Sequence, residues 1–312
     1  MNPLSELPLV VIVGPTASGK STLAVWLAQR LNGEVIACDS TQLYRGFDIG
    51  TAKPTTEERC GVAHHLLDVL HSYEATTAGA YRERAIAALA DLRERKKLPI
   101  FTAGTGLYLR ALLEGFAEVP QRSEELRERL RASAAEHGPG QLHGILRKLD
   151  PASAKKIAPA DEQKLIRAIE VCLLTKQPLS RVHETGRAPL TGWRAIKIGL
   201  NPAREDLYQR IQQRTEAMLR GGWLDEVRRL IQTGVKEDAK PFDFIGYREL
   251  RKVLVGELEL SEARGAIQQA TRRYAKRQLT WFRREAGVTW FEGFGDNPEV
   301  ERRALETVRG AL

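Results

Sequence analysis

The chain has little cysteine and no long apolar segment. Its three cysteines, Cys38, Cys60 and Cys172, lack metal-binding spacing, so the sequence predicts neither a disulfide-stabilised scaffold nor a zinc site. No run of about 18 apolar residues occurs, which excludes a predicted transmembrane helix. The N-terminus lacks the basic start and the small-residue cleavage site of a signal peptide. We therefore expect a protein of the reducing cytoplasm.

The rest of the composition is ordinary for a soluble globular protein. Hydrophobic residues make up 42% and charged residues 28% of the 312 positions, which argues against extensive disorder. This length corresponds to one large domain or two small ones, and it is enough to bury a sizeable core.

The formal net charge of +8 is unevenly distributed. Residues 1–120 have a balance of −1, and the remainder of the chain has a balance of +9. A basic excess of this kind is typical of a protein that binds a polyanion. Solvated helix faces without any ligand are the alternative interpretation.

Short apolar runs alternate with longer amphipathic ones over most of the chain. The strands that this pattern predicts are 9–13, 33–38, 99–103, 195–200 and 288–291. The predicted helices are 21–31, 77–97, 104–113 after a short loop, 204–220, 224–232, 261–285 and 298–308. Such alternation indicates an α/β fold with a parallel sheet flanked by helices.

Residues 120–190 have a different character. The segment 123–136 is charge-dense and helical in pattern, and His137–Gly140 interrupts it. Further short helices are punctuated by Pro151, Pro159 and Pro178, and no convincing strand is present. We predict an all-helical subdomain at 120–190, inserted into an α/β core formed by residues 1–119 and 191–312.

A phosphate-binding loop follows the first predicted strand. The sequence GPTASGKS fits G-x-x-x-x-G-K-[ST] with Gly14, Pro15, Thr16, Ala17, Ser18, Gly19, Lys20 and Ser21. Glycines allow successive N–H groups to surround an anion, and the next helix adds its positive end. Lys20 is expected to reach the terminal phosphates, and the Ser21 hydroxyl suits Mg²⁺. The motif predicts a bound di- or triphosphate without requiring a nucleotide; a plain glycine-rich turn is the alternative.

Polar residues follow two further predicted strands. Asp39 and Ser40 come directly after 33–38, and Thr105 follows 99–103. The carboxyl ends of parallel strands share one edge, so these residues should converge on the phosphate loop. Asp39 suits a metal ligand, a general base or a helix cap, and Thr105 suits a hydrogen-bond donor to a leaving group or a cap.

Two further observations concern the same edge. Gln42 and Tyr44 lie just beyond Asp39 and could face a base or its ribose, although a lone glutamine is usually a surface residue. No Walker B motif is evident, that is, an apolar strand ending in aspartate that is followed by an ATPase glutamate. The best candidate strand end is Asp39 itself, which disfavours an ATP-hydrolysing motor.

The predicted C-terminal helix is basic and aromatic. Residues 271–284 read TRRYAKRQLTWFRR, with six basic residues and no acid. Basic groups interleaved with aromatic rings suit phosphate backbones and unstacked bases. The alternative is that Trp281 and Phe282 pack in the core while the arginines face water.

Several segments together resemble the bacterial tRNA dimethylallyltransferase (tRNA isopentenyltransferase) family. They are GPTASGKS at 14–21, DSTQLYRGFDIGTAKP at 39–54, HHLLD at 64–68, AGTGLYLRALLEG at 103–115, DEQKLIRAIEV at 161–171, FIGYREL at 244–250 and KRQLTWFRR at 276–284. They occur in the family's order over nearly the whole chain. Ala103 stands where the family often has glycine, and Asp243 where many members have arginine. No cysteine and histidine cluster like the zinc-finger extension of eukaryotic relatives is present.

The resemblance implies a P-loop NTPase-like fold and transfer of a dimethylallyl group from dimethylallyl diphosphate to N6 of tRNA adenine 37. Asp39 would accept the amine proton, Thr105 would bind the bridging oxygen, and Lys20 with the loop and Mg²⁺ on Ser21 would stabilise the departing diphosphate. Arg210 and Arg214 would add phosphate contacts. We expect Gln42 to read a flipped adenine.

The resemblance also implies a tRNA surface, and we expect the helical insertion to hold the anticodon stem-loop. The residues concerned are Asp39, Ser40, Thr41, Gln42, Thr105, Arg127, Gln163, Lys164, Leu165, Ile166, Arg167, Asp243, Phe244, Ile245, Gly246, Tyr247, Arg248, Lys276, Arg277, Gln278, Leu279, Thr280, Trp281, Phe282 and Arg283. We expect a monomer without a membrane partner.

Three other functions are compatible with parts of the sequence. A P-loop kinase for a small metabolite would use the loop and Mg²⁺ but leave the basic half of the chain without a role. An adenylate isopentenyltransferase would prenylate free nucleotides and would not need the basic helix. A non-catalytic RNA-binding protein with a vestigial loop would bind tRNA without chemistry.

Overall fold

The computed structural model describes residues 6–115, 119–120, 122–138, 140–185 and 188–312. They form two compact units, Met1–Leu112 with Thr191–Leu312 and Leu113–Leu190. The second unit includes the predicted helical insertion at 120–190 and the end of the segment that precedes it.

The first unit contains a parallel sheet in the order β3-β2-β4-β1-β5-β6. Its strands are β1 (Leu7–Val13), β2 (Gly33–Cys38), β3 (His64–His65), β4 (Leu98–Ala103), β5 (Trp193–Leu200) and β6 (Val288–Phe291). The central strand β1 is fully buried from Leu9 to Val13. It lies between two neighbours with helices on both faces, which is why its sequence is a continuous apolar run.

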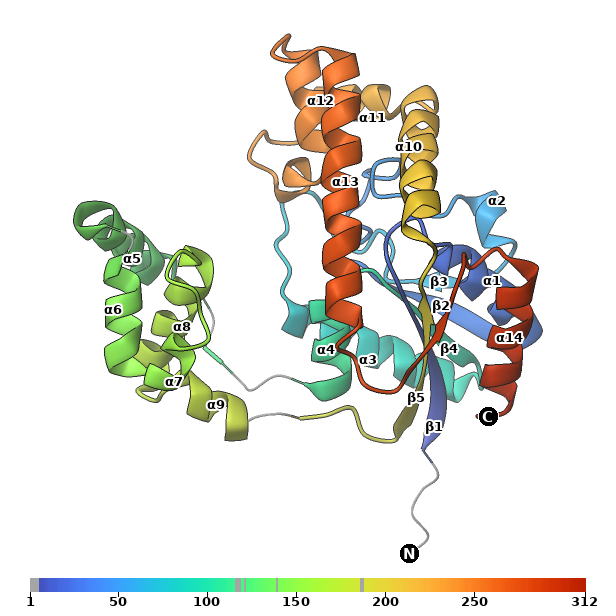
Figure 1. The fold of residues 1–312 in the computed structure, drawn as a ribbon, viewed down its shortest axis with the longest axis horizontal. Coiled ribbons are helices and arrows are strands. Elements are labelled where there is room, and N and C mark those ends of the chain that lie inside the picture. Colours follow the sequence, from blue (N-terminus) through green and yellow to red (C-terminus); the bar gives the residue numbers. More distant parts are fainter. Residues whose placement is uncertain (1–5, 116–118, 121, 139, 186–187) are drawn as a thin grey trace, which may run out of the picture. The chain divides into compact units, whose positions relative to one another are not determined.

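Helices cover both faces of this sheet (Figure 1). The helices that lie wholly or partly in this unit are α1 (Lys20–Arg30), α2 (Thr56–Arg59), α3 (Ala78–Glu94), α4 (Gly106–Glu114), α10 (Arg204–Arg220), α11 (Trp223–Gln232), η1 (Lys240–Asp243), α12 (Tyr247–Leu254), α13 (Leu260–Phe282) and α14 (Pro298–Arg309). Apolar residues of α1 and α14 pack with strand residues in one core cluster, exemplified by Leu23, Ile198 and Ala304. The long helix α13 packs against α10 and α12.

Helices joined by loops are the regular structure found among the described residues of the second unit. It comprises α5 (Glu124–His137), α6 (Gly140–Leu149), α7 (Pro151–Ala154), α8 (Glu162–Thr175) and α9 (Leu179–Thr185). Leu142 and Leu146 of α6 pack against Leu165 and Ile169 of α8, giving the unit its own apolar core. The expected interruption at 137–140 includes position 139, which lies outside the described residues.

The predicted fold class is confirmed, with four elements that the sequence did not indicate. Strand β3 and helix α2 are too short to show a periodic pattern. Helices η1 and α12 lie in a segment where Pro241 and Gly246 obscure the helical period. The long helix α13 ends at Phe282, slightly before the predicted end at 285.

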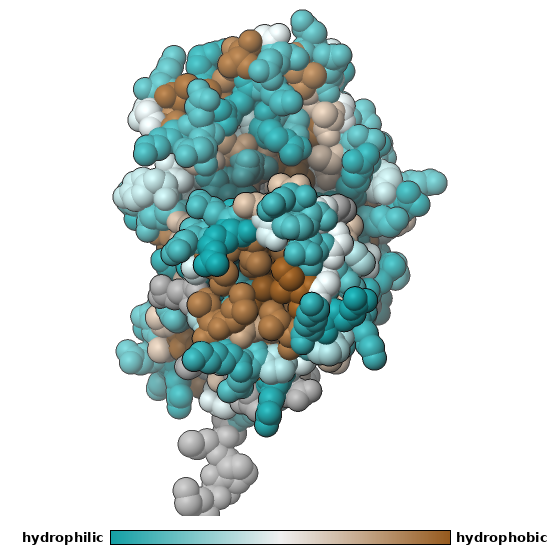
Figure 2. Space-filling model, turned by 90° about the vertical axis from the view of Figure 1, so that its left-hand side faces the viewer, coloured by the Kyte–Doolittle hydropathy of each residue, from teal (hydrophilic) through white to brown (hydrophobic). Residues whose placement is uncertain are grey.

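On the face shown in Figure 2, hydrophilic side chains surround a central apolar area. Leu173 and Leu174 of α8 are among the large apolar side chains that remain exposed. Among the residues that the structure describes, no helix is both long and apolar enough to cross a membrane.

Candidate active site

Strand register brings the predicted functional residues together. Val13 at the end of β1 pairs with Ala103 at the end of β4, and Ala103 also pairs with Cys38 at the end of β2. The segments that follow these strands therefore leave the sheet side by side, as expected for parallel strands. They border a cleft of about 1340 Å³. Its lining includes Lys20, Ser21, Asp39, Gln42, Gly104, Arg210, Arg214, Phe244, Arg277 and Gln278.

The phosphate loop has the left-handed backbone that its glycines predict. Gly14 and Gly19 have φ of 148° and 87°, and Ala17 has φ of 64°, which is uncommon for a residue with a side chain. Gly19 is also required by space, because a Cβ there would lie 2.8 Å from the Gly295 nitrogen. The loop thus lies directly against the segment that precedes α14.

Lys20 points back into the loop. Its Nζ donates to the carbonyls of Gly14 at 3.0 Å and Pro15 at 2.8 Å. Burial lowers the pKa of Lys20 to about 8, with Asp39 opposing this shift and Arg214 adding to it. An anion in the loop would favour the charged ammonium, so this lysine suits a phosphate ligand.

Asp39 and Thr105 are held by neighbouring loop residues. Asp39 Oδ1 accepts hydrogen bonds from the Thr41 amide at 2.9 Å and the Thr41 hydroxyl at 2.7 Å. Thr105 Oγ1 accepts from the Ser40 amide at 3.0 Å and donates to Ser40 Oγ at 3.2 Å. The Asp39 carboxylate is therefore fixed in a turn, which differs from the helix cap considered as its alternative role.

Gln42 and Tyr44 differ in their access to the cleft. Gln42 lines the cleft, but its Nε2 already donates to the carbonyls of Thr51 at 3.2 Å and Ala52 at 3.1 Å. Tyr44 is only 3% exposed, and its hydroxyl donates to the Glu74 carbonyl at 3.2 Å. The expectation that Tyr44 faces a base or ribose is wrong, because its ring is packed inside the unit.

The two predicted phosphate arginines have different environments. Arg214 is half-buried, and its Nη1 lies 3.4 Å from the Thr16 hydroxyl of the loop. Burial lowers its pKa from the ordinary arginine value. Arg210 forms two hydrogen bonds of 2.9 Å with Asp296, and its guanidinium lies over the Phe294 ring. Arg210 lines the cleft, yet both of its terminal nitrogens already donate to the Asp296 carboxylate instead of being directed to a phosphate.

Residues 243–248 include both accessible and buried positions. Phe244 and Ile245 line the cleft, as does Asp243, which pairs with Lys240 at 2.8 Å. Tyr247 is fully buried, and its hydroxyl donates to Glu226 Oε1 at 2.6 Å. Tyr247 therefore supports the cleft wall from inside, which corrects its prediction as a tRNA contact. Gly246 touches the Trp223 ring closely, and Arg248 is exposed beside Glu249 at 2.7 Å.

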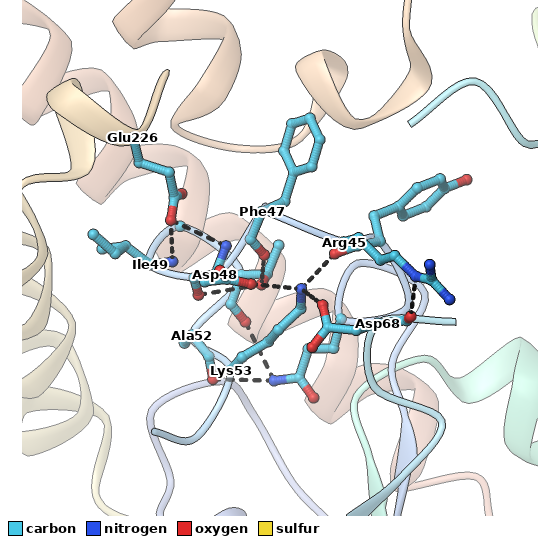
Figure 3. A network of polar contacts seen from close by, with 12 residues as sticks. Arg45, Phe47, Asp48, Ile49, Ala52, Lys53, Asp68 and Glu226 are labelled. Carbon is cyan, nitrogen blue, oxygen red and sulfur yellow. Dashed lines mark hydrogen bonds and ion pairs between the residues drawn. The ribbon is translucent and has the colours of Figure 1, made fainter. Parts of the chain in front are cut away.

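A polar network around the buried Lys53 side chain, which sequence reasoning missed, connects the loop between Tyr44 and Lys53 with Asp68 and Glu226 (Figure 3). Lys53 is 8% exposed and bonds to Asp48 at 2.8 Å, to Asp68 at 2.5 Å and to the Tyr44 carbonyl. Glu226 of α11 accepts from the amides of Asp48 at 3.1 Å and Ile49 at 2.8 Å. The sequence segment DIGTAKP is conspicuous, but nothing in it reveals these distant partners.

Helix α13 presents a mixture of surface and interior residues. Lys276, Arg277, Thr280 and Arg283 are exposed, Leu279 and Trp281 are half-buried, and Phe282 is fully buried. Phe282 is a core residue, so its side chain is unavailable to tRNA. Gln278 is 5% exposed and bonds to two active-site loops, an arrangement that differs from a surface contact.

The second unit contains the other predicted tRNA residues. Arg127 and Arg167 both bind the fully buried carboxylate of Glu170, at 3.0 Å and 2.5 Å. Gln163 and Lys164 are exposed, and Lys164 pairs with Asp161. Leu165 and Ile166 lie in the core of the unit. The expected contacts through these two apolar side chains are wrong in this structure, because they complete the packing of α8.

The Ser21 hydroxyl is the group of the site that suits Mg²⁺. The described residues contain no cluster of three or more histidine, cysteine or acidic side chains able to hold a metal. Ser21 lies half-buried at the loop and lines the cleft together with Asp39. One hydroxyl beside a phosphate loop fits an ion that keeps several waters and shares the ligand's phosphate oxygens.

Comparisons with known proteins agree with this arrangement. A sequence model of the IPP transferase family matches residues 42–285. The tRNA dimethylallyltransferase of Koribacter versatilis is 49% identical over 98% of this chain and 99% of that protein, and that of Solibacter usitatus is 48% identical over 97% and 98%.

Solved structures are similar over the same extent. The tRNA isopentenylpyrophosphate transferase of Bacillus halodurans has a TM-score of 0.72 and 39% identity, covering 98% of this chain and 96% of that one. A eukaryotic dimethylallyltransferase acting on tRNA has a TM-score of 0.82 and 26% identity, covering 96% and 78%. The relatives and the solved structures match nearly the whole chain and the family model matches residues 42–285, so the chain belongs to the IPP transferase family.

Proposed function

We propose that the protein transfers a dimethylallyl group from dimethylallyl diphosphate to N6 of adenine 37 in tRNA. The observation that carries the proposal is that the phosphate loop and Asp39 line one cleft, with Thr105 bonded to the Ser40 amide beside Asp39. The family to which the chain belongs supports the same reaction. This function gives both the phosphate loop and the basic helix α13 a use.

The reaction forms one bond and breaks another. The adenine amine attacks the allylic carbon while the bond between that carbon and the bridging oxygen breaks, and the electron pair leaves with the diphosphate. Asp39 accepts the proton released from N6. Its second carboxylate oxygen suits this task, because Thr41 occupies Oδ1 and fixes the orientation of the group.

Other residues stabilise the leaving group. Thr105 Oγ1 can donate to the bridging oxygen, since its present donation to Ser40 is a long 3.2 Å contact. Lys20 and Arg214 supply positive charge beside the loop. Bound Mg²⁺, held through Ser21 and phosphate oxygens, would neutralise charge on the departing diphosphate.

Recognition of the acceptor uses exposed cations. Arg277 lines the cleft, Lys276 is exposed on the same helix, and Arg283 is exposed directly after the helix ends. These cations suit contacts to the phosphate backbone of tRNA. To reach Asp39, adenine 37 must leave the stacked bases of the anticodon loop, which costs a few kcal/mol. We expect the protein to act as a monomer.

The test is nucleoside analysis by mass spectrometry after incubation with unmodified tRNA, Mg²⁺ and dimethylallyl diphosphate. We expect N6-dimethylallyladenosine that depends on both substrates and on Asp39. Prenylation of AMP but not tRNA would indicate a nucleotide prenyltransferase, and ATP consumption without tRNA would indicate a kinase. Binding of tRNA that survives Lys20→Ala, with no product from the wild type, would indicate a non-catalytic RNA-binding protein.

A further inference from the structure

Gln278 connects two loops that belong to different strands. Its Oε1 accepts a hydrogen bond from the Thr16 amide at 2.7 Å, and its Nε2 donates to the Gly104 carbonyl at 2.8 Å. Thr16 lies in the phosphate loop after β1, and Gly104 follows β4. The side chain is 5% exposed, so both ends of the amide are used inside the protein.

The two partners fix the orientation of this amide. A backbone N–H can only donate, and a backbone carbonyl can only accept. The oxygen of Gln278 must therefore face Thr16, and its nitrogen must face Gly104. The amide of glutamine combines an acceptor and a donor at one terminus without bearing a charge, whereas an ionised carboxylate of the same size can only accept.

The bridge lies between the two halves of the proposed chemistry. The phosphate loop holds the leaving group, whereas Gly104 directly precedes Thr105 and touches Asp39. The Tyr274 hydroxyl also donates to the Gly104 carbonyl, at 3.2 Å, and Arg214 lies 3.4 Å from the Thr16 hydroxyl. Helix α13 thus bonds to both loops through Gln278 and a second time to the Gly104 loop through Tyr274.

We propose that Gln278 is a positioning residue that sets the distance between the bound diphosphate and the Asp39 and Thr105 pair. This inference rests on the proposed function. It assigns Gln278 a role distinct from the tRNA contact implied by its place in the KRQLTWFRR segment. Because a displacement of about 1 Å can cost about 100-fold in rate, loss of the bridge should act mainly on the chemical step.

The experiment compares Gln278→Met and Gln278→Glu with wild type. Methionine keeps the length of the side chain but loses both hydrogen bonds. Glutamate can still accept from Thr16, but it presents a second acceptor to the Gly104 carbonyl. The matched control is Gln269→Met, because Gln269 is exposed on the same helix. Thermal melting establishes that each variant is folded.

Three quantities are measured: the single-turnover rate at saturating substrates, the Kd for inorganic pyrophosphate and the Kd for tRNA. We expect the single-turnover rate of Gln278→Met to fall about 100-fold. Pyrophosphate should bind several-fold more weakly, because Thr16 is released. The Kd for tRNA should stay within about two-fold of wild type, and Gln269→Met should match wild type in all three.

The pH profile of Gln278→Glu provides a second readout. A protonated carboxyl has both a donor and an acceptor, like the amide that it replaces. The rate of this variant relative to wild type should therefore recover as the pH falls, and a purely structural defect would not show this recovery.

The inference is overturned if Gln278→Met keeps its single-turnover rate and loses tRNA affinity, which is the behaviour of a tRNA contact. It is also overturned if both variants equal wild type or if Gln278→Glu shows no recovery at low pH. An inactive wild-type protein would instead refute the proposed function. The pyrophosphate affinity would still report on the bridge in that case.

Discussion

The α-carbon of Gly104 lies so near the Asp39 carboxylate that no side chain fits between them. A Cβ on Gly104 would lie 2.1 Å from Asp39 Oδ2 and 3.0 Å from its Cγ. This requirement for glycine comes from space, since Gly104 is not among the residues with a positive φ. The loop after β4 therefore determines where the carboxylate of the β2 loop can lie.

Gly104→Ala tests this relationship. The new methyl group must displace either Asp39 or the loop that carries Thr105, so we expect turnover to fall about 100-fold while tRNA still binds. Rates and tRNA affinity measured in parallel check the prediction. Gly265→Ala on α13 is the control, because nothing lies within 4 Å of its added Cβ. A fully active Gly104→Ala enzyme would mean that Asp39 need not occupy this position.

Asp39→Asn isolates proton acceptance from shape. The amide can still accept from Thr41 through its oxygen, but it cannot accept the N6 proton. We expect the single-turnover rate to fall by about 10²–10⁴, the range typical of a lost general base. The Kd for tRNA, measured by filter binding, should change only slightly. Equal losses in rate and tRNA affinity would contradict the general-base role.

The sequence was sufficient to predict the edge at which the site forms, because the buried apolar runs indicate parallel strands and the carboxyl ends of parallel strands share one edge. Val13, Cys38 and Ala103 end their strands in register, and the residues after them meet as parallel topology requires. For Phe282 the sequence allows either a contact with RNA or a place in the core. The structure places Phe282 among the buried residues of α13, in the core.

Other features depend on partners that are distant in the chain. Thr16 and Gln278 are separated by 262 positions, and nothing local in either segment indicates that they bond. The helical period does place Gln278 in line with Ile267, Ala275 and Phe282, which are all buried. That spacing could have identified Gln278 as an interior residue. Lys53 could not be identified in this way, because its partners come from irregular loops.

Replacing Arg277 and Arg283 with alanine should weaken tRNA binding and reduce its salt dependence. Both arginines are exposed, Arg277 on α13 and Arg283 directly after its last residue, so each can neutralise a phosphate and release a counterion. We expect the slope of log K against log salt to become shallower by about one for each phosphate that is no longer neutralised. Arg302→Ala is the control, because Arg302 is already paired with Glu299 and Glu306 on α14. An unchanged slope in the double variant would place both arginines outside the tRNA interface.

Pyrophosphate affinity should fall as the pH rises through about 8. Burial lowers the pKa of Lys20 to about 8 in the free protein, so the ammonium is charged below this pH and lost above it. A bound anion needs the charged form, and binding must therefore take up a proton at higher pH. Calorimetric titration with pyrophosphate from pH 6 to pH 9 checks this. Lys20→Met measures the dependence that comes from the ligand's own ionisation. Identical pH profiles for the two proteins would exclude Lys20 as the titrating group.

Glu170 should stabilise the helical unit in a pH-dependent way. Burial alone would raise its pKa, but hydrogen bonds from Arg127 and Arg167 outweigh it and lower the value to about 2. Its ionised form therefore contributes to stability fully above its ordinary pKa of 4.5, and this contribution disappears as the pH falls toward 2.

Glu170→Gln removes this charge while keeping a similar shape. At pH 7 we expect the free energy of unfolding to fall by about 2 kcal/mol, which is below the usual cost of breaking a buried pair because both arginines reach solvent. Urea denaturation followed by circular dichroism at pH 7 and at pH 3 measures the difference from wild type. The difference should shrink at pH 3, since the wild-type carboxylate has then lost much of its advantage. A difference that is the same at both pH values would mean that Glu170 acts through packing alone, without its charge.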